Sequence, residues 1–263
     1  SPILLTTDPS HIAYLSRLKY KVALYDCADD LVELCNHRIP NLAEKENELM
    51  RSVDVITVSA TELEKKAKLQ NEHVLLVNNG VNPEVFSLPF AKHKESKMVI
   101  GYVGAMLGDC FDVKIIENLA EKYSEAEIHL IGPVNFNTNL LKNYKNIKFL
   151  GPKKHAELPF YMEKFDVCII PFFINKLTIS VNPVKLFEYL ATGKPVVSSA
   201  LPEVEKYESD VYIARSDEEW ISLIYKVIEE DSLEQYKRRI QIAAENSWDN
   251  RAERILGYLE SYQ

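Results

Sequence analysis

The sequence predicts an α/β fold in which parallel sheets are covered by helices on both faces. Short apolar runs recur along the whole chain, and several are apolar at every position rather than at alternate ones. Strands with such continuous apolar character are buried on both faces, which is typical of parallel sheets. Amphipathic stretches with helical spacing lie between the runs. This alternation of strand and helix indicates doubly wound α/β domains.

The first group of predicted strands lies before residue 90. Residues 1–6 lead directly into a strand, and further apolar runs follow at residues 22–25, 55–58 and 74–77. Four strands make up about half of a Rossmann-like domain, so we expect residues 1–90 to form an incomplete one. The chain begins with Ser1 rather than Met. We therefore expect an excised fragment that lacks the N-terminal part of this domain.

The second group of predicted strands lies in residues 91–246 and is large enough for a complete domain. The six apolar runs are at residues 99–103, 128–131, 147–150, 167–170, 195–197 and 211–213. The segment from Phe86 to Lys97 has no periodicity and contains Pro89, which indicates a linker. A helix begins at Asp217 with acidic residues in its first turn. A final helix occupies residues 247–263, and we expect it to pack back on the first domain.

Composition excludes several classes of protein. The chain has 263 residues, 46% of them hydrophobic, and a formal net charge of -8. Nucleic-acid binders need the opposite charge balance. The four cysteines form no CxxC pair, so a disulfide framework or a zinc site is a poor interpretation. No apolar run reaches the roughly 20 residues of a membrane span, and no signal peptide is visible. Reduced thiols in this context favour a cytosolic enzyme.

The most informative stretch is residues 182–197, Asn-Pro-Val-Lys-Leu-Phe-Glu-Tyr-Leu-Ala-Thr-Gly-Lys-Pro-Val-Val. Pro183 fits a first helical position and Gly193 fits a helix stop, so a short helix is expected between them. Its N-terminus would point to the sheet edge where α/β proteins bind ligands, and its dipole and free N–H groups suit a diphosphate. Lys185 adds a positive charge, and Glu188 could accept hydrogen bonds from a ribose diol. The alternative is a solvated Lys–Glu pair with no function.

Two other patterns suggest chemistry more weakly. The glycines of residues 101–108 follow a predicted strand, where a backbone can approach a phosphate closely, but a tight turn explains them equally well. Three acids, Asp26, Asp29 and Asp30, follow the strand at residues 22–25. One of them could serve as general base for an acceptor hydroxyl, with Asp30 slightly favoured over Asp29. The alternative is an ordinary acidic loop.

Taken together, these motifs resemble those of GT-B glycosyltransferases of family 4, the group 1 transferases. Residues 79–86, NGVNPEVF, resemble the turn before the interdomain linker, with Asn82 where the family usually has Asp. Residues 100–104 are similar to the strand and loop that open the donor domain. Residues 183–197 are similar to the donor helix and the following strand. The P-x-K-x-x-E-Y-L-A variant resembles bacterial polysaccharide enzymes, including teichuronic-acid and exopolysaccharide transferases.

The resemblance implies a GT-B architecture with two Rossmann-like domains and a nucleotide-sugar in the cleft, without a required metal or other cofactor. It implies Asp29 and Asp30 as catalytic candidates. Donor-binding residues are then expected at Gly104, Gly108, Lys153, Lys154, Asn182, Val184, Lys185 and Glu188. One departure is that Ser180 stands where many members carry a first glutamate that touches the sugar. Donor identity and stereochemical outcome therefore stay open.

The expected function is transfer of a sugar, of hexosyltransferase type, from a nucleotide-diphospho-sugar to an acceptor in bacterial surface polysaccharide or glycoconjugate synthesis. The acceptor would be a sugar, a polysaccharide or a lipid-linked glycan. Two alternatives are a GT-B-fold sugar-nucleotide epimerase and a non-catalytic nucleotide-binding or interaction module. We expect the fragment itself to be inactive. Further expectations are a cytoplasmic location, association with the inner membrane face through the missing N-terminal part, and a homo-oligomer formed at the incomplete sheet.

Overall fold

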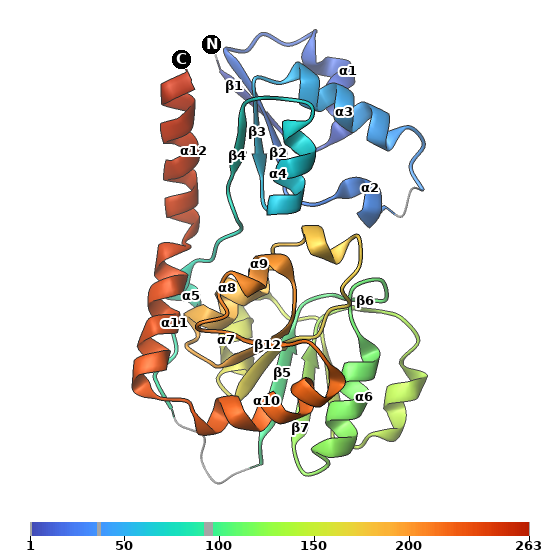
Figure 1. The fold of residues 1–263 in the computed structure, drawn as a ribbon, viewed down its shortest axis with the longest axis vertical. Coiled ribbons are helices and arrows are strands. Elements are labelled where there is room, and N and C mark those ends of the chain that lie inside the picture. Colours follow the sequence, from blue (N-terminus) through green and yellow to red (C-terminus); the bar gives the residue numbers. More distant parts are fainter. Residues whose placement is uncertain (1, 36–37, 92–96, 263) are drawn as a thin grey trace. The chain divides into compact units, whose positions relative to one another are not determined.

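The computed structural model of the chain describes residues 2–35, 38–91 and 97–262 (Figure 1). The chain divides into two compact units. The first comprises Ser1–Asn79, Ile179–Asn182 and Asp249–Gln263, and the second comprises Gly80–Thr178 and Pro183–Trp248. The division after Asn79 comes earlier than the boundary expected near residue 90. Part of the expected linker, residues 92–96, lies outside the described residues.

The first unit is built on a four-stranded parallel sheet with the strand order β1-β2-β3-β4. The strands are β1 Ile3–Thr6, β2 Val22–Cys27, β3 Val55–Val58 and β4 Val74–Leu76. Every residue of β3 is buried, and so is every residue of β2 except Asp26. Continuous apolar sequence thus marks the strands that are covered on both faces.

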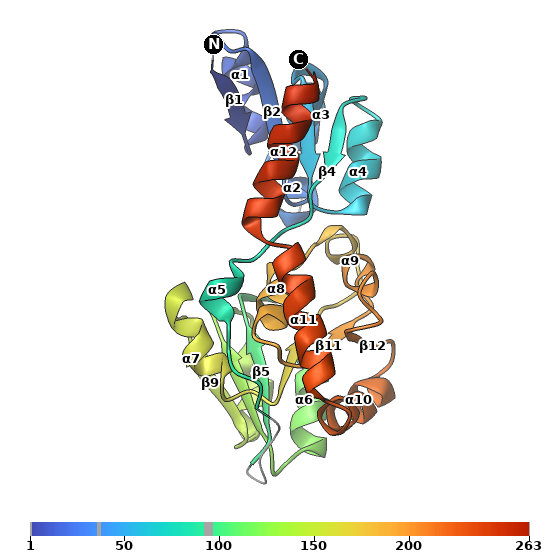
Figure 2. The same ribbon diagram turned by 90° about the vertical axis from the view of Figure 1, so that its left-hand side faces the viewer.

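Helices cover both faces of this sheet. They are α1 Ile12–Leu15, α2 Leu31–Leu34, α3 Leu42–Ser52 and α4 Thr61–Lys68, with α12 Trp248–Tyr262 at the end of the chain. On one face, Tyr25 packs in a cluster with side chains of α3 and α4. On the other face, Val22, Leu24 and Val55 pack with Leu259 of α12 (Figure 2). Successive side chains of a strand point to opposite faces, so β2 serves both clusters.

The second unit is built on a six-stranded parallel sheet with the strand order β12-β11-β10-β5-β7-β9. Its strands are β5 Val99–Val103, β7 Glu127–Ile131, β9 Ile147–Gly151, β10 Val167–Ile170, β11 Val196–Ser199 and β12 Tyr212–Ala214. A separate parallel pair joins β6 Met106–Leu107 to β8 Val134–Asn135. The six predicted strands and the doubly wound α/β class are confirmed.

Helices flank the second sheet. They are α5 Pro83–Phe86, α6 Val113–Lys122, α7 Leu158–Met162, α8 Val184–Ala191, α9 Pro202–Glu205, α10 Asp217–Glu229 and α11 Leu233–Glu245, with 3-10 turns at Thr138–Asn143 and His155–Glu157. Two more 3-10 turns are Pro9–His11 in the first unit and Thr178–Ser180. Helix α10 packs on α6, β10 and β11, while α8 packs on α11 and β11. Pro183 caps α8 instead of occupying its first turn, because its backbone is extended, with ψ 115°.

The strand order places a ligand crevice in the second unit. Strand β5 is central, and the chain continues from it to β7 and β9 on one side, whereas β10, β11 and β12 lie on the other side. Loops that leave β5 and β10 therefore run in opposite directions from their carboxyl ends. Such a topological switch point is where open α/β sheets bind ligands.

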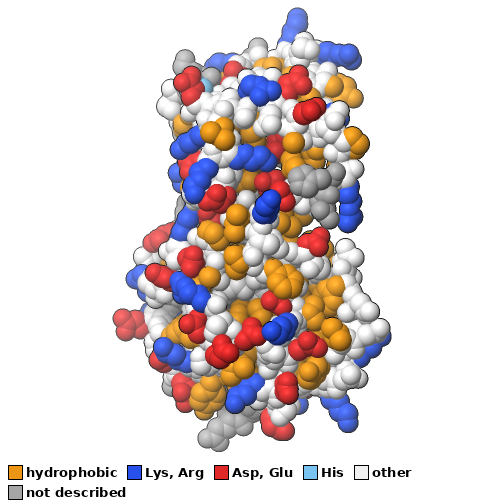
Figure 3. Space-filling view, turned by 45° about the vertical axis from the view of Figure 1, so that its right-hand side comes forward, with side chains coloured by type: hydrophobic (Ala, Val, Ile, Leu, Met, Phe, Trp, Pro, Cys, Tyr) orange, Lys and Arg blue, Asp and Glu red, His pale blue; other side chains and the backbone are white. Residues whose placement is uncertain are grey.

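Two further features are the distribution of charge on the surface and the apolar character of the helices. Acidic and basic side chains are interspersed on the face drawn in Figure 3. None of the helices in the described ranges combines the length and the apolar character that crossing a bilayer requires.

Candidate active site

The loop after β5 depends on two glycines, Gly104 and Gly132, whose backbones lie close together. Gly104 has φ +139° and Gly132, after β7, has φ +140°, a region that side chains with a Cβ rarely adopt. A Cβ on Gly132 would lie 2.0 Å from the Gly104 carbonyl oxygen. At Gly108 a Cβ would make ordinary contacts only, 3.5 Å from the Asn135 carbonyl oxygen. Of the two predicted loop glycines, Gly104 is thus the one that the geometry requires.

Lys185, in the first turn of α8, lies directly over this glycine. A Cβ on Gly104 would come within 2.8 Å of Lys185 Cε, so the missing side chain makes room for the lysine. Lys185 Nζ is 4.5 Å from the ring centroid of Phe172 and 5.5 Å from that of Tyr102. These distances are typical of cation–π contacts. The lysine therefore connects the loops that leave β5 and β10 at the switch point.

The charge of Lys185 is not neutralised by a carboxylate. Within the described ranges no acidic side chain forms an ion pair with it, so the solvated Lys185–Glu188 pair considered from the sequence is wrong. Burial lowers the pKa of Lys185 to about 8, against the opposing field of Glu188. At pH 7 about nine-tenths of these side chains still carry a proton. A half-buried cation with an adjacent helix N-terminus is suited to bind an anion.

Glu188 lies one turn further along α8 and is held by a histidine that the sequence did not single out. Its side chain is 11% exposed, and Oε1 lies 2.9 Å from His155 Nε2. The buried ring of Phe86 packs edge-on against His155 with 5.1 Å between ring centroids. His155 follows β9, and Phe86 is the last residue of the NGVNPEVF motif. These contacts fix one carboxylate oxygen and leave the other available to a ligand.

The two lysines expected beside the nucleotide are placed differently. Lys153 Nζ lies 5.2 Å from the ring centroid of Tyr161. Lys154 is exposed, and its backbone N–H donates to Glu157 at 3.1 Å at the start of a 3-10 turn. Both lysines lie in the loop after β9, and the residue of this loop that contacts Glu188 is His155. The sequence signal that could have identified it is its position after a strand at the ligand edge.

Hydrogen bonds of Asn182 connect the segment before α8 to the NGVNPEVF motif. Asn182 is 3% exposed; its Oδ1 accepts the backbone N–H of Asn79 at 2.8 Å, and its carbonyl accepts Asn79 Nδ2 at 2.6 Å. Asn182 Nδ2 has no hydrogen-bond partner within the described ranges. Ser180 is buried, and Val184 is half-buried and offers no polar side-chain group. Asn182 thus holds the NGVNP turn and keeps one free donor.

In the first unit, the three acidic candidates have different roles. Asp26 lies inside β2 rather than after it, and its Oδ1 accepts the hydroxyl of Thr57 at 2.8 Å. Asp30 caps α2 by accepting the N–H of Glu33 at 3.2 Å and pairs with Lys66 Nζ, also at 3.2 Å. Asp26 and Asp30 therefore both stabilise the fold.

Asp29 is the acid that the fold leaves available. Its side chain reaches solvent, and within the described ranges its carboxylate has no partner. The protein atoms around it raise its pKa, because they displace water that would stabilise the charge. A carboxylate that is unpaired and more basic than usual is the better general base. Asp29 thus lacks the partners that Asp30 has, and the choice of general base between them stays a prediction.

Metal chemistry was not expected from the sequence. Within the described ranges, no group of three or more His, Cys, Asp or Glu side chains is arranged to hold a metal ion. The positive charge of the site belongs to Lys185, together with the N–H groups of α8.

Comparisons with known proteins agree with this geometry. The family model described as glycosyl transferases group 1 matches residues 97–230, just over half of the chain. A Bacillus subtilis (strain 168) protein named as a teichuronic acid biosynthesis glycosyltransferase, TuaH, is 29% identical over 280 residues, covering 96% of this chain and 70% of that protein.

Among solved structures, sucrose-phosphate synthase from Thermosynechococcus elongatus matches with a TM-score of 0.73 and 16% identity, covering 99% of this chain and 73% of that one. Anabaena HepE, solved with UDP and glucose, matches with a TM-score of 0.73 and 16% identity, covering 98% and 77%. At these identities the likeness supports the fold, and the expected GT-B architecture is confirmed.

Proposed function

Since the chain belongs to the glycosyl transferases group 1 family, we propose that it transfers a sugar from a nucleoside-diphosphate sugar to a hydroxyl of a glycan in bacterial surface polysaccharide synthesis. The likeness to TuaH supports the polysaccharide assignment. HepE, which has the same fold, was solved with UDP, and this supports a nucleotide donor. The observation that carries the proposal is the unpaired Lys185 ammonium at the switch point of the second sheet.

The proposed reaction exchanges one bond at the anomeric carbon. The bond from this carbon to the diphosphate oxygen breaks, and a bond to the acceptor oxygen forms. Negative charge develops on the leaving nucleoside diphosphate. Lys185 and the first N–H groups of α8 are fixed before the reaction begins, so they stabilise this charge without reorganisation. In this proposal no metal ion is needed to neutralise the leaving group.

Glu188 is proposed to bind the ribose. A carboxylate accepts two hydrogen bonds from a vicinal diol, and His155 holds its Oε1 at 2.9 Å. Hydrogen bonds to charged groups contribute about 1.5 to 3 kcal/mol each. On the acceptor side, Asp29 is proposed as the general base if the reaction inverts configuration. If the reaction retains configuration, the leaving phosphate takes the acceptor proton.

The test begins with nucleotide binding. Thermal unfolding is measured with UDP, GDP and ADP at millimolar concentration, where ligand at about 100 Kd adds about 2.7 kcal/mol to the stability. We expect at least one nucleotide to raise the melting temperature. Glu188→Gln should weaken its binding more than the matched change Ser180→Ala. No shift with any of the three nucleotides would contradict the proposal.

Product analysis then distinguishes transfer from epimerisation. The full-length protein is incubated with the sugar form of the nucleotide that raises the melting temperature, with and without a glycan acceptor. Transfer releases the nucleoside diphosphate and lengthens the acceptor. A changed sugar on an intact nucleotide would instead favour an epimerase.

A further inference from the structure

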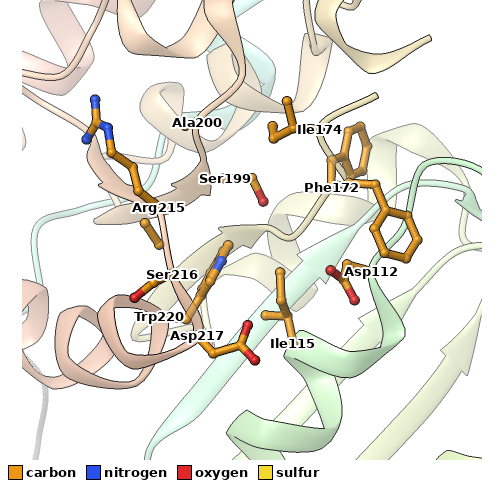
Figure 4. Close-up of a pocket in the computed structure, with 12 residues that line it drawn as sticks. Asp112, Ile115, Phe172, Ile174, Ser199, Ala200, Arg215, Ser216, Asp217 and Trp220 are labelled. Atoms are coloured by element: carbon orange, nitrogen blue, oxygen red, sulfur yellow. The ribbon is translucent and has the colours of Figure 1, made fainter. Parts of the chain in front are cut away.

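A pocket in the second unit lies beside the proposed donor site. It has a volume of about 230 Å³. It lies at the carboxyl ends of β10, β11 and β12, between the first turns of α6 and α10 (Figure 4). Phe172 lines it and also contacts Lys185, so the two places share one wall. Nothing in the proposed donor chemistry uses its other residues.

An unpaired hydroxyl points into this pocket. Ser199, the last residue of β11, is 4% exposed, and its Oγ has no hydrogen-bond partner within the described ranges. Figure 4 shows the hydroxyl directed into the space that the lining residues enclose. The neighbouring Ser198 donates its hydroxyl to the Ser199 carbonyl at 2.8 Å. The Ser199 oxygen is not one of the side-chain atoms that are both fully buried and without a partner, so it opens to the pocket, where water or a ligand completes its hydrogen bonding.

The charged lining excludes most charged ligands. Asp112 and Asp217 border the pocket, and the pKa of Asp112 is raised first by its burial and then by repulsion from Asp217. A carboxylate or phosphate would meet both acids. A cation would meet the positive ends of the dipoles of α6 and α10, which are ten and thirteen residues long. The side chains of Asp112 and Ser216 already cap the N-termini of α6 and α10. The field therefore favours a neutral ligand that donates hydrogen bonds to the acids and accepts one from Ser199.

Arg215 does not add its positive charge to the pocket. Its guanidinium is directed to Glu205 at 2.8 Å and to Glu208 at 3.5 Å, and Figure 4 shows it turned away from the pocket. Lys114 pairs with Asp217 from the exposed side at 3.2 Å. Both acids thus keep acceptor oxygens for a ligand.

The remaining walls are apolar and include an indole. Trp220 is 3% exposed and lines the pocket with Ile115, Phe172 and Ile174. A cavity of about 150 Å³ holds a benzene ring, so this larger space admits a six-membered ring with small substituents. A ring that presents hydroxyl groups to two acids and a serine, and C–H groups to aromatic side chains, is a pyranose.

We infer that the pocket between α6 and α10 binds a neutral monosaccharide through Ser199, Asp112 and Asp217. This binding is separate from the proposed function and does not depend on it, because the pocket would take a free sugar that carries no nucleotide.

Tryptophan fluorescence gives a direct test. The chain has two tryptophans, so Trp248→Phe leaves Trp220 as the reporter. Glucose, galactose and mannose are titrated, with glucuronate and glucosamine as charged relatives, and ligand-detected NMR provides a second readout. We expect saturation by at least one neutral hexose at roughly millimolar concentration, and weaker binding of both charged sugars.

Paired serine variants localise the binding. Ser199→Ala should weaken the hexose roughly threefold to tenfold, because one hydrogen bond is lost. The control Ser198→Ala, whose hydroxyl serves the backbone, should leave the affinity unchanged. Three results would each overturn the inference. The first is no binding by either method up to 200 mM, which is on the order of 100 times the roughly millimolar constant expected. The second is tighter binding of a charged sugar, and the third is an equal effect of the two serine variants. UDP melting shifts measured on the same samples show separately whether the donor proposal stands.

Discussion

Replacing Lys185 with methionine should make the protein more stable and a poorer nucleotide binder at the same time. Burial lowers the pKa of Lys185 from 10.5 to about 8. In the unfolded chain the amine keeps its ordinary pKa, so between these two values the unfolded state binds more protons. The stability of the wild type therefore rises with pH through this window, and below it the buried charge is a full cost.

The size of the effect follows from the shift. About 2.5 pKa units correspond to roughly 3 kcal/mol, and the cation–π contacts and residual solvent reduce what removal of the charge recovers. Methionine keeps the apolar stem, so we expect a gain of roughly 1 to 3 kcal/mol at pH 7, which is a melting temperature higher by roughly 2 to 8 °C. UDP affinity should fall roughly tenfold to a hundredfold, because a charged hydrogen bond is lost.

The assay is thermal unfolding with and without UDP, at pH 7 and pH 10. At pH 10 Lys185 is neutral in the folded protein but still mostly protonated in the unfolded chain, so the stability difference should fall to roughly a quarter of its value at pH 7. Lys164→Met is the matched control, because Lys164 Nζ lies 4.9 Å from the ring centroid of Phe160 but is exposed; its removal should change neither quantity. A methionine variant that is less stable at pH 7, or that binds UDP as the wild type does, would refute the reasoning.

Three further predictions concern neighbouring residues. Gly104→Ala should reduce the melting shift given by UDP, because the new Cβ would lie 2.8 Å from Lys185 Cε at a φ of +139°. His155→Ala should weaken UDP binding roughly threefold to tenfold in titration calorimetry, because Glu188 loses a hydrogen bond, and His155→Gln should recover part of the loss. In the full-length protein, Asp29→Asn should lower kcat roughly 10²-fold with UDP affinity intact in an inverting reaction, whereas Asp30→Ala should lower the melting temperature by losing a cap that contributes about 1 kcal/mol.

The sequence was most informative where structure is local. Apolar runs identified all six strands of the second sheet. The run is continuous in β10, where both faces are buried, whereas His129 interrupts β7 and the exposed Lys148 interrupts β9. Helix α8 ends before Gly193, which adopts φ +70°, as a glycine at a helix C-terminus does. These signals need only neighbouring residues, so no knowledge of the tertiary structure was required.

The sequence was least informative where a side chain acts through a distant partner. His155 and Glu188 are separated by 33 positions, and Asp30 is separated from Lys66 by 36. Nothing near Asp30 distinguishes a helix cap from a general base, because the distinction depends on Lys66 in α4. Likewise, the isolated histidine gave no sign that the fold would bring it to Glu188. Topology could assign such residues to a sheet edge, but only packing determines which of them meet.

The position of Lys185 is itself an argument for an anionic ligand. A lysine is unfavourable in the first turn of a helix, because the helix dipole is positive there. It is also unfavourable when buried, and the described residues provide no carboxylate to pair with it. The rings of Tyr102 and Phe172 offset only part of this cost. A diphosphate between Lys185 and the N-terminus of α8 would supply the missing counter-charge and offset the dipole repulsion, so the instability of the free site would make binding of such an anion favourable.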